Sequence, residues 1–102
     1  MAWLDVIQQP DLTPGHRAFI DLKDGTRVAV FNLDNAFFAI ESMCTHAMFE
    51  LDDAPIEGDT IICPLHGAKF CIKTGAVCSA PAYEDLRTFP VRVVEGMVQI
   101  EE

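Results

Sequence analysis

The sequence predicts an all-β fold built of antiparallel hairpins, and three observations support this prediction. Short runs rich in valine, isoleucine and phenylalanine recur along the chain, and these residue types favour strands. Dipeptides that contain glycine, asparagine or aspartate separate the runs, as hairpin turns require. No segment carries a sustained apolar period of 3.6 residues, so no long helix is expected. Together these features indicate a small sandwich or barrel.

The elements follow from these runs in order. The predicted strands are residues 17–22, 26–33, 36–41, 60–63, 68–72, 76–78, 86–94 and 97–101. Two-residue turns are expected at Asp24-Gly25, Asp34-Asn35 and Glu95-Gly96, and Thr74-Gly75 joins two of the shorter strands. A long irregular segment at residues 44–67 interrupts the hairpins. Such segments in compact domains are usually functional.

Length and composition favour one soluble domain. Half of the 102 residues are hydrophobic and 23% are charged, which argues against disorder and allows a core. No apolar run approaches the roughly 20 residues that cross a bilayer. The amino-terminal segment MAWLDVIQQP lacks the basic start of an export signal. A cytoplasmic location without membrane contact is therefore expected.

The charge balance is strongly acidic, with 7 basic and 16 acidic side chains and a net charge of −9. Nucleic acid and anionic membranes are therefore excluded as expected partners. A basic protein surface is favoured, because opposite potentials steer encounter. The alternative interpretation is that the acidity only keeps a small protein soluble.

Four potential metal ligands form two short motifs, Cys44-x-His46 and Cys63-x2-His66. Thiolate selects zinc, copper(I) or iron–sulfur clusters, and imidazole suits zinc and iron. Common zinc fingers pair like with like, whereas each motif here holds one cysteine and one histidine. This order suits two adjacent metal atoms, with sulfur on one and nitrogen on the other, as in an asymmetrically ligated [2Fe–2S] cluster. A zinc-stabilised interaction module is the alternative.

These motifs resemble those of the Rieske family. The resemblance also rests on KFCIKTG at residues 69–75, on Ala80-Pro81 and on TFPV at residues 88–91. It covers nearly the whole chain and is strongest to the small Rieske ferredoxins of bacterial ring-hydroxylating dioxygenases, of the toluene and biphenyl type. It implies a single Rieske domain at residues 1–102 whose loop-rich, cluster-binding part spans about residues 42–82.

The resemblance also implies a ligand set for a Rieske [2Fe–2S] cluster. Cys44 and Cys63 would bind the inner iron, and His46 and His66 the outer iron. Two neutral imidazoles in place of two thiolates make the centre less negative, which raises its potential above that of an all-cysteine ferredoxin.

Four positions distinguish this chain from the Rieske proteins of respiratory complexes. Those proteins carry two further cysteines, which would fall at Phe49 and Leu65. They also place a serine and a tyrosine that donate to sulfur, at the positions of Ala68 and Phe70. Without these donors the cluster keeps more electron density. A potential near the low end of the Rieske range, roughly −150 mV, is expected.

The implied function is one-electron transport. The donor would be a flavin-dependent NAD(P)H ferredoxin reductase, and the acceptor the terminal oxygenase of an aromatic-ring-hydroxylating dioxygenase, both through transient complexes. The sequence carries no catalytic triad, phosphate-binding loop or nucleotide fingerprint. We therefore expect an electron-transfer component and not an enzyme. A Rieske small subunit of the assimilatory nitrite reductase type is the alternative.

Two groups of residues near the motifs are predicted to meet partners. An apolar collar that shields the cluster and makes the direct contact comprises Ala47, Met48, Phe49, Pro64, Leu65 and Pro81. Acidic docking residues, which would attract a basic partner, are Glu50, Asp52, Asp53, Glu57 and Asp59. A merely solvated loop is the alternative for the acids.

The sequence departs from the usual Rieske pattern at two positions near the ligand motifs. Ala47 and Ala54 stand where the family usually has glycine, so the loop shape near His46 is expected to differ. Cys71 and Cys78 lie symmetrically about the Thr74-Gly75 turn. They could face each other, but two reduced, packed thiols are expected in preference to a disulfide. The aromatic residues within strands are expected in the core: Trp3, Phe19, Phe31, Phe37, Phe38 and Phe89.

Overall fold

A computed structural model describes residues 2–44, 49–63, 67–79 and 85–102. Its elements are β1 (Trp3–Gln8), the 3₁₀ helix η1 (Gln9–Asp11), β2 (Arg17–Asp21), β3 (Arg27–Leu33), β4 (Ala36–Glu41), β5 (Met43–Cys44), β6 (Phe49–Glu50), β7 (Ile56–Glu57), β8 (Thr60–Ile62), β9 (Lys69–Cys71), β10 (Val77–Ser79), β11 (Thr88–Phe89), β12 (Val91–Val94) and β13 (Met97–Glu101). Every strand pair in the described residues is antiparallel. The predicted all-β fold is confirmed.

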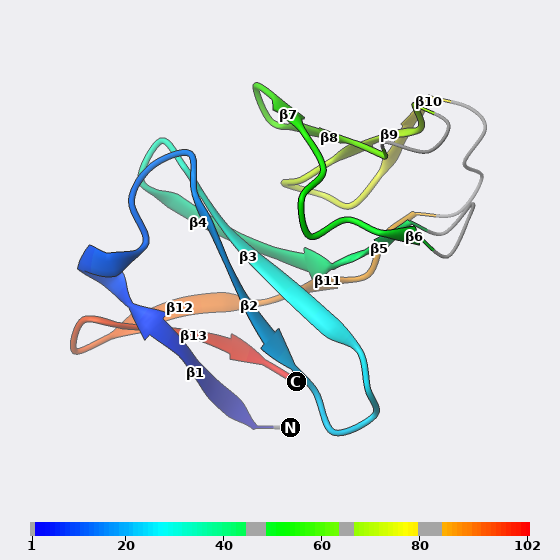
Figure 1. Ribbon diagram of the computed structural model, residues 1–102. Coiled ribbons are helices and arrows are strands. Elements are labelled where there is room, and N and C mark those ends of the chain that lie inside the picture. Colours follow the sequence, from blue (N-terminus) through cyan, green and yellow to red (C-terminus); the bar gives the residue numbers. More distant parts are fainter. Residues whose placement is uncertain (1, 45–48, 64–66, 80–84) are drawn as a thin grey trace.

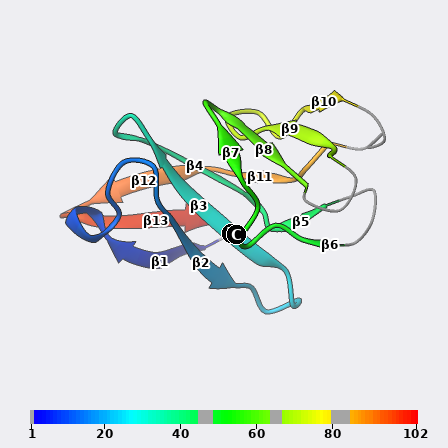
Figure 2. The same cartoon turned by 45° about the horizontal axis from the view of Figure 1, so that its top comes forward.

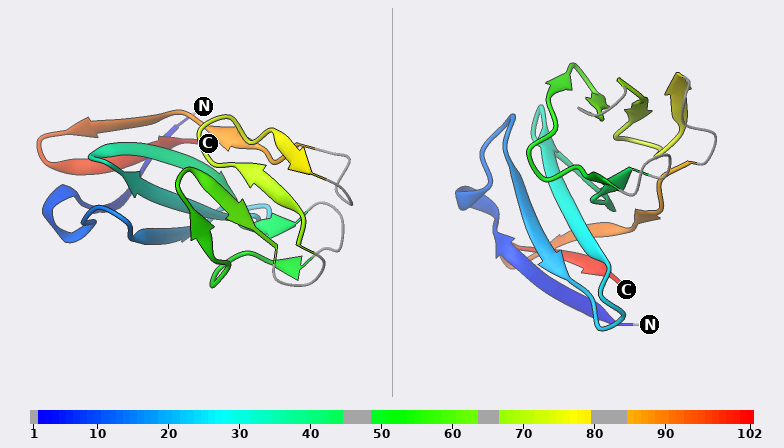
Figure 3. Two further views of the ribbon diagram at one scale, coloured as in Figure 1. Left: turned by 90° about the horizontal axis from the view of Figure 1, so that it is seen from above. Right: turned by 45° about the vertical axis from the view of Figure 1, so that its right-hand side comes forward.

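The strands fall into two parts (Figure 1). The basal part contains a three-stranded sheet, in the order β1-β13-β12, and a four-stranded sheet, in the order β11-β4-β3-β2. The upper part, residues 42–86, contains a four-stranded sheet in the order β10-β9-β8-β7 and the β5–β6 pair. Figure 2 and the right panel of Figure 3 show the upper strands lying over one face of β3 and β4.

Two hydrophobic cores share strand β3. Val28 and Val30 point into the basal core, while Ala29 and Phe31 point into the upper core, and all four are buried. Because successive strand residues face opposite sides, a strand covered on both faces reads as a continuous apolar run. The buried residues of the basal core are Leu12, Leu22, Val28, Val30, Ala39, Phe89, Val98 and Ile100. Those of the upper core are Ala29, Phe31, Ile40, Leu51, Ala54, Ile61, Cys63, Ala68, Phe70, Ile72 and Leu86.

The predicted hairpin turns are correct in two places and wrong in one. Asp34 and Asn35 have φ angles of 56° and 70°, as a two-residue turn between β3 and β4 needs. Glu95-Gly96 forms the same kind of turn between β12 and β13, with φ angles of 50° and 79°. The Asp24-Gly25 turn is longer than predicted, because the Leu22 N–H donates to the Thr26 carbonyl and that of Gly25 to the Leu22 carbonyl. The connection therefore spans residues 22–26.

The predicted strand at residues 86–94 is divided by Pro90. The first piece, β11, pairs with β4, whereas the second, β12, pairs with β13 in the other basal sheet. Proline has no N–H to donate to a ladder, so the chain leaves one sheet here and enters the next. The amino-terminal strand β1, which pairs with β13, was not predicted.

One predicted core aromatic is exposed. Phe19 has 39% of its surface accessible, because its side of β2 faces solvent, where the Arg27 guanidinium lies over its ring at 6.0 Å. Trp3 is partly buried under the guanidinium of Arg92, whose central carbon lies 4.1 Å from the ring centroid.

The chain passes from the basal part into the upper part after Glu41 and returns at Arg87, and these two residues are hydrogen-bonded neighbours. The Glu41 N–H donates to the Arg87 carbonyl at 2.9 Å, and the Arg87 N–H donates to Glu41 Oε1 at 2.9 Å. One step back, Ile40 pairs with Thr88 across β4 and β11. Residues 42–86 are thus inserted between two adjacent strands of one sheet.

Candidate metal centre

The first ligand motif begins at the end of a short hairpin. Cys44, the last residue of β5, pairs with Phe49 of β6, and Met43 pairs with Glu50. For Cys44, Phe49 and Glu50 the description is of the backbone alone. His46, Ala47 and Met48 lie outside the described residues. The fold therefore places Cys44 at the point where this hairpin turns.

The second motif begins in the upper core. Cys63 follows β8 and is fully buried, with a free thiol. Its N–H donates to the Ala68 carbonyl at 2.7 Å, and its carbonyl accepts from the Gly67 N–H at 2.9 Å. Gly67 has a φ of 74°, a conformation that glycine adopts without strain. Pro64, Leu65 and His66 lie outside the described residues.

The described residues before and after the segment that carries Pro81 are hydrogen-bonded to each other. Asp85 Oδ1 accepts from the Val77 N–H at 2.9 Å, and the Leu86 N–H donates to the Gly75 carbonyl at 2.8 Å. Gly75 lies so close to Leu86 that a Cβ at this position would clash with the Leu86 carbonyl oxygen. Residues 80–84 are outside the described ranges.

The strands that lead into these segments come to one end of the upper part. The β5–β6 hairpin and the end of β10 lie on the same side in Figure 1 and in the left panel of Figure 3. Strand β5, which ends at Cys44, and strand β10, which ends at Ser79, therefore reach the same end of the upper part.

The ligand set cannot be read from the described residues. Within residues 2–44, 49–63, 67–79 and 85–102, no group of three or more histidine, cysteine or acidic side chains is placed to hold a metal. Both motif histidines fall outside these ranges, so the set of Cys44, His46, Cys63 and His66 stays a prediction. The donor types still fit, since two thiolates and two imidazoles suit an iron–sulfur site.

Two residues that closely follow the second motif are apolar and buried. Ala68 and Phe70 are fully buried in the upper core, which also contains Cys63. Neither side chain has a hydroxyl group, so neither can donate a hydrogen bond to a sulfur atom.

Arg17 was not predicted as part of the site. Its Nη1 donates to the carbonyls of Leu51 and Asp52, at 3.2 Å each, and its Nη2 donates to that of Ala54 at 2.8 Å. Its guanidinium lies over the Phe31 ring, 5.0 Å from the centroid. Burial lowers the pKa of Arg17, and the charges of Asp53 and Asp52 oppose this shift. Ala54 is buried and its φ is not positive, so this turn does not need the glycine that the family usually has there.

The predicted acidic docking residues differ in their surroundings. Asp52 accepts from the Ser42 hydroxyl at 2.6 Å and forms an ion pair with Arg27. Asp53, Glu57 and Asp59 are exposed, while the side chain of Glu50 is not described. Asp52 is therefore engaged within the chain, and the docking role of the acids stays a prediction.

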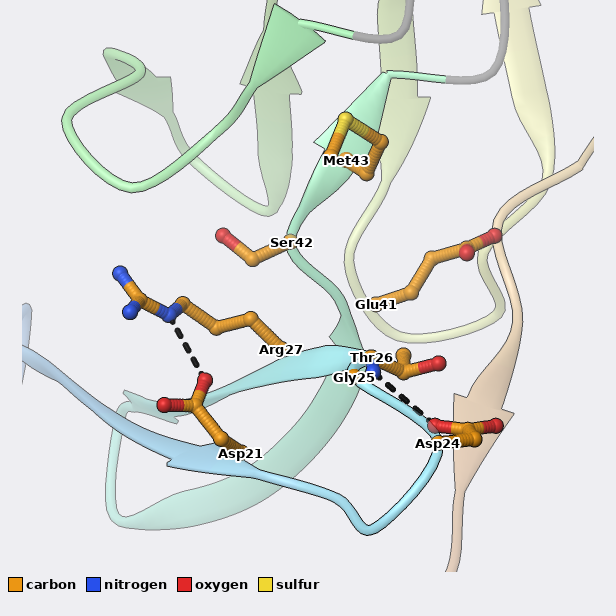
Figure 4. A pocket seen from close by; sticks show the side chains of 8 residues that line it. All are labelled: Asp21, Asp24, Gly25, Thr26, Arg27, Glu41, Ser42 and Met43. Atoms are coloured by element: carbon orange, nitrogen blue, oxygen red, sulfur yellow. Dashed lines mark hydrogen bonds and ion pairs between the residues drawn. The ribbon is translucent and has the colours of Figure 1, made fainter.

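A pocket of about 560 Å³ lies at the base of β5 (Figure 4). Three carboxylates line it, and each has a partner within the chain. Asp21 pairs with Arg27, Asp24 accepts from the Thr26 N–H at 2.9 Å, and Glu41 accepts from the Arg87 N–H.

No disulfide joins Cys71 and Cys78 in the structure, and their redox state stays a prediction. The two residues do not face each other, because Phe70 pairs with Val77 and the register shifts between Val77 and Ser79. This irregularity leaves Cys78 without a partner residue in the β9 register, and its side chain is exposed. The expectation that both thiols are packed is wrong for Cys78.

An all-β fold together with two Cys-then-His motifs in the sequence fits a small iron–sulfur protein. A family model for the Rieske [2Fe-2S] domain matches residues 2–90. The chain belongs to the Rieske family, and its cofactor is a Rieske [2Fe–2S] cluster. The predicted family, fold and cofactor are confirmed.

Individual relatives agree with this assignment. The biphenyl dioxygenase ferredoxin subunit of Pseudomonas sp. (strain KKS102) is 39% identical over 84 residues, 81% of this chain and 77% of the relative. Ferredoxin CarAc of Metapseudomonas resinovorans is 35% identical over 98 residues, 96% of this chain and 92% of the relative.

Solved structures are similar as well. A complex of reduced oxygenase and oxidised ferredoxin in carbazole 1,9a-dioxygenase contains a chain with a TM-score of 0.90 and 35% identity, covering 96% of this chain and 91% of that one. The Sphingomonas yanoikuyae B1 ferredoxin has a TM-score of 0.89 and 31% identity, covering 99% of each chain. These relatives are named as ferredoxins, which confirms the prediction of an electron-transfer component and not an enzyme. In the described residues, no helix is long and apolar enough to cross a membrane.

Proposed function

We propose that this chain is the ferredoxin component of a multicomponent aromatic-ring-hydroxylating dioxygenase. It carries one electron at a time from a flavin-dependent NAD(P)H ferredoxin reductase to the terminal oxygenase. The observation that carries the proposal is the match over 96% of the chain to a ferredoxin solved in complex with its oxygenase. The relative from biphenyl dioxygenase, at 39% identity, supports the same role.

The proposed ligands are Cys44 and Cys63 for the inner iron, and His46 and His66 for the outer iron. When bound, the cluster supplies a centre that accepts and releases one electron. Support comes from the placement of Cys44 at a hairpin turn and of Cys63 at the base of a tight loop closed by Gly67. Burial of Cys63 excludes water from a ligand that must bind as thiolate.

The proposed potential is low for a Rieske centre, roughly −150 mV. Support comes from Ala68 and Phe70, which are buried beside the second motif without a hydroxyl donor. The residues at the positions of the respiratory disulfide, Phe49 and Leu65, cannot form that bond. Fewer donors to sulfur leave more electron density on the cluster and disfavour reduction.

The proposed docking surface has an apolar centre, the predicted collar of Ala47, Met48, Phe49, Pro64, Leu65 and Pro81. The acids proposed to attract a basic partner are Asp53, Glu57 and Asp59, which are exposed, together with Glu50. Glu57 and Asp59 flank the turn between β7 and β8, at the opposite end of β8 from Cys63. Their expected effect is therefore on the association rate and its salt dependence, through the charge of the upper part, and not on direct contact.

The proposed organisation is a single domain at residues 1–102, with the cluster-binding part at about residues 42–82, located in the cytoplasm. Support comes from the upper core, in which Ala29, Phe31 and Ile40 of the basal strands pack with residues of the inserted segment. Such shared burial joins the two parts in one domain.

The function is tested by reconstitution with a flavoprotein reductase, NADH and an aromatic-ring terminal oxygenase. Product formation should require this protein and should stop in the Cys63→Ser variant. The reduced protein should give a rhombic electron paramagnetic resonance (EPR) signal with the low average g value of a histidine-ligated cluster. A colourless, zinc-containing protein without this signal would overturn the proposal, and a clearly positive potential would overturn its low-potential part.

The docking surface has its own test. Replacing Asp53, Glu57 and Asp59 by their amides should raise the KM of the oxygenase for this protein and flatten its dependence on salt. The matched control replaces three acids of the basal part, Asp11, Glu95 and Glu102, and should leave both unchanged. Equal effects in the two triple variants would assign the change to net charge alone.

A further inference from the structure

The turn that follows the first ligand hairpin directs three carbonyls at one cation. Arg17 reaches the carbonyl oxygens of Leu51, Asp52 and Ala54 at 3.2, 3.2 and 2.8 Å. Ala54 is buried, so its carbonyl would need another partner if the guanidinium were absent. The Leu51 carbonyl also accepts from the Ala54 N–H, at 3.2 Å. The planar fork of arginine can supply several donors at once, which a single ammonium group cannot do in this geometry.

This contact joins the two parts of the molecule. Arg17 belongs to β2 in the basal part, whereas residues 51–54 directly follow β6 in the upper part. Phe31 of β3 supports the guanidinium from one face, at 5.0 Å. The side chain is therefore held by an aromatic ring on a basal strand while its donors hold the turn.

A second tie closes the base of the same hairpin. The Leu51 N–H donates to the Ser42 carbonyl at 3.1 Å, and the Ser42 hydroxyl donates to Asp52 Oδ1 at 2.6 Å. Arg27 of β3 pairs with the same carboxylate. Ser42 lies two residues before Cys44, so the chain on both sides of the first motif is linked to the turn that Arg17 binds.

The two ligand cysteines are supported to different degrees. Cys63 follows β8, which pairs with β7 and β9 in a four-stranded sheet. In the described residues, β5 and β6 pair only with each other, through two residue pairs. The position of Cys44 relative to Cys63 therefore depends on the contacts that basal residues make with the turn at residues 51–54.

We propose that Arg17 is a positioning residue for the cluster. By holding the turn at residues 51–54, it fixes the β5–β6 hairpin, whose first strand ends at Cys44. The proposal rests on the ligand role of Cys44 in the proposed function. Contacts that orient metal ligands commonly change metal affinity by about 10- to 100-fold when they are lost.

The test compares three variants of the cluster-containing protein. Arg17→Gln removes the charge and the fork, and Arg17→Lys keeps the charge without the fork. The matched control is Arg92→Gln, because Arg92 also lies over an aromatic ring and donates to a side chain, Gln99, but within the basal part. The readouts are the rate of cluster loss to a chelator, the EPR spectrum of the reduced protein and the midpoint of urea unfolding.

Arg17→Gln should lose its cluster about tenfold faster than the wild type, with shifted or broadened g values in the molecules that keep it. Arg17→Lys should give an intermediate rate, and Arg92→Gln should match the wild type. If Arg17 only stabilises the fold, the unfolding midpoint falls while the EPR spectrum stays as in the wild type, and the proposal is wrong. Should Arg17→Gln not fold, Arg17→Lys decides by the same criteria.

Failure of the proposed function looks different from failure of this inference. If the wild type itself binds no [2Fe–2S] cluster and shows no EPR signal on reduction, the ligand assignment fails. If the wild type holds the cluster and the Arg17 variants hold it equally well, only the positioning role fails.

Discussion

The basal and upper parts of the molecule both have fully buried cores, but they are held together differently. Five of the seven basal strands, β1 to β4 and β13, have five to seven residues, while β12 has four and β11 has two. The upper strands β5 to β10 have two or three. Side-chain contacts to the backbone supplement the short ladders above, from Arg17 at residues 51–54 and from Asp85 at Val77.

The region that carries the ligand cysteines thus has shorter strand ladders than most of the basal part. Two-residue ladders supply few cooperative hydrogen bonds, so the upper part depends on side-chain ties, on its core and on the cluster. The basal part supplies a support whose stability does not depend on the ligands. We therefore expect perturbations of the cluster to affect the upper part more than the basal part.

Removal of the cluster should have the largest effect, and only on the upper part. In apoprotein prepared with a chelator, the amides of Ile61 and Phe70 should exchange at least about a hundredfold faster, the effect of losing a ligand that contributes about 2.7 kcal/mol. The amides of Val30 and Val98 should keep their protection. Hydrogen exchange followed by NMR measures both sets, and equal acceleration in the two parts would contradict the division.

A pair of isoleucine truncations should separate stability from cluster retention. Ile72 in the upper core and Ile100 in the basal core are both fully buried. Each change to alanine should cost about 4 kcal/mol of the free energy of unfolding, from lost burial and a cavity. Only Ile72→Ala should speed cluster loss under native conditions. Equal rates of cluster loss in the two variants, measured by visible absorbance, would show that the parts are not distinct.

Alanine substitutions at Gly75 and Gly25 should show how tightly Gly75 packs against Leu86. Gly75→Ala forces a left-handed residue to carry a Cβ, at about 1–2 kcal/mol, and brings it against the Leu86 carbonyl, at about 1–3 kcal/mol. A total loss of roughly 3 kcal/mol is expected. Gly25→Ala shares the positive φ but has open space, so it should lose about 1 kcal/mol. Urea unfolding followed by circular dichroism gives both values, and equal losses would argue against close packing at Gly75.

Loss of the hydrogen bond between Asp85 and the Val77 N–H should change the free energy of unfolding least. Asp85→Ala removes the acceptor for the Val77 N–H and should cost about 1 kcal/mol. Asp85→Asn retains an oxygen that can accept and should cost less. Thermal unfolding of the two variants makes the comparison, and an equal loss of stability in both would mean that the charge of Asp85, and not the hydrogen bond, matters here.

Much of the basal part could be predicted because its signals are local. The turns at Asp34-Asn35 and Glu95-Gly96 follow from the positive φ angles that these residues tolerate. Strand β1 was missed because its partner, β13, lies at the other end of the chain. The break at Pro90 was missed because apolar residues continue on both sides of it.

The candidate site was predictable as chemistry but not as architecture. The order of cysteine and histidine in the two motifs indicated the cluster. Nothing around Arg17 in the sequence marks its partners, which lie 34 to 37 residues away. Asp52 looked like one of a run of solvated acids, and only folding brings Ser42 and Arg27 to it.

The insertion of residues 42–86 between two paired strands has a consequence for how such proteins change over time. Glu41 and Arg87 are hydrogen-bonded neighbours, so any segment whose ends lie about 5 Å apart can occupy this place without altering the support. Such a segment must also present an apolar surface that covers Ala29, Phe31 and Ile40, and acceptors for Arg17 and Arg27. The redox module is thus exchangeable as a unit, and its loops can be recombined or replaced while the sheets beneath keep their sequence.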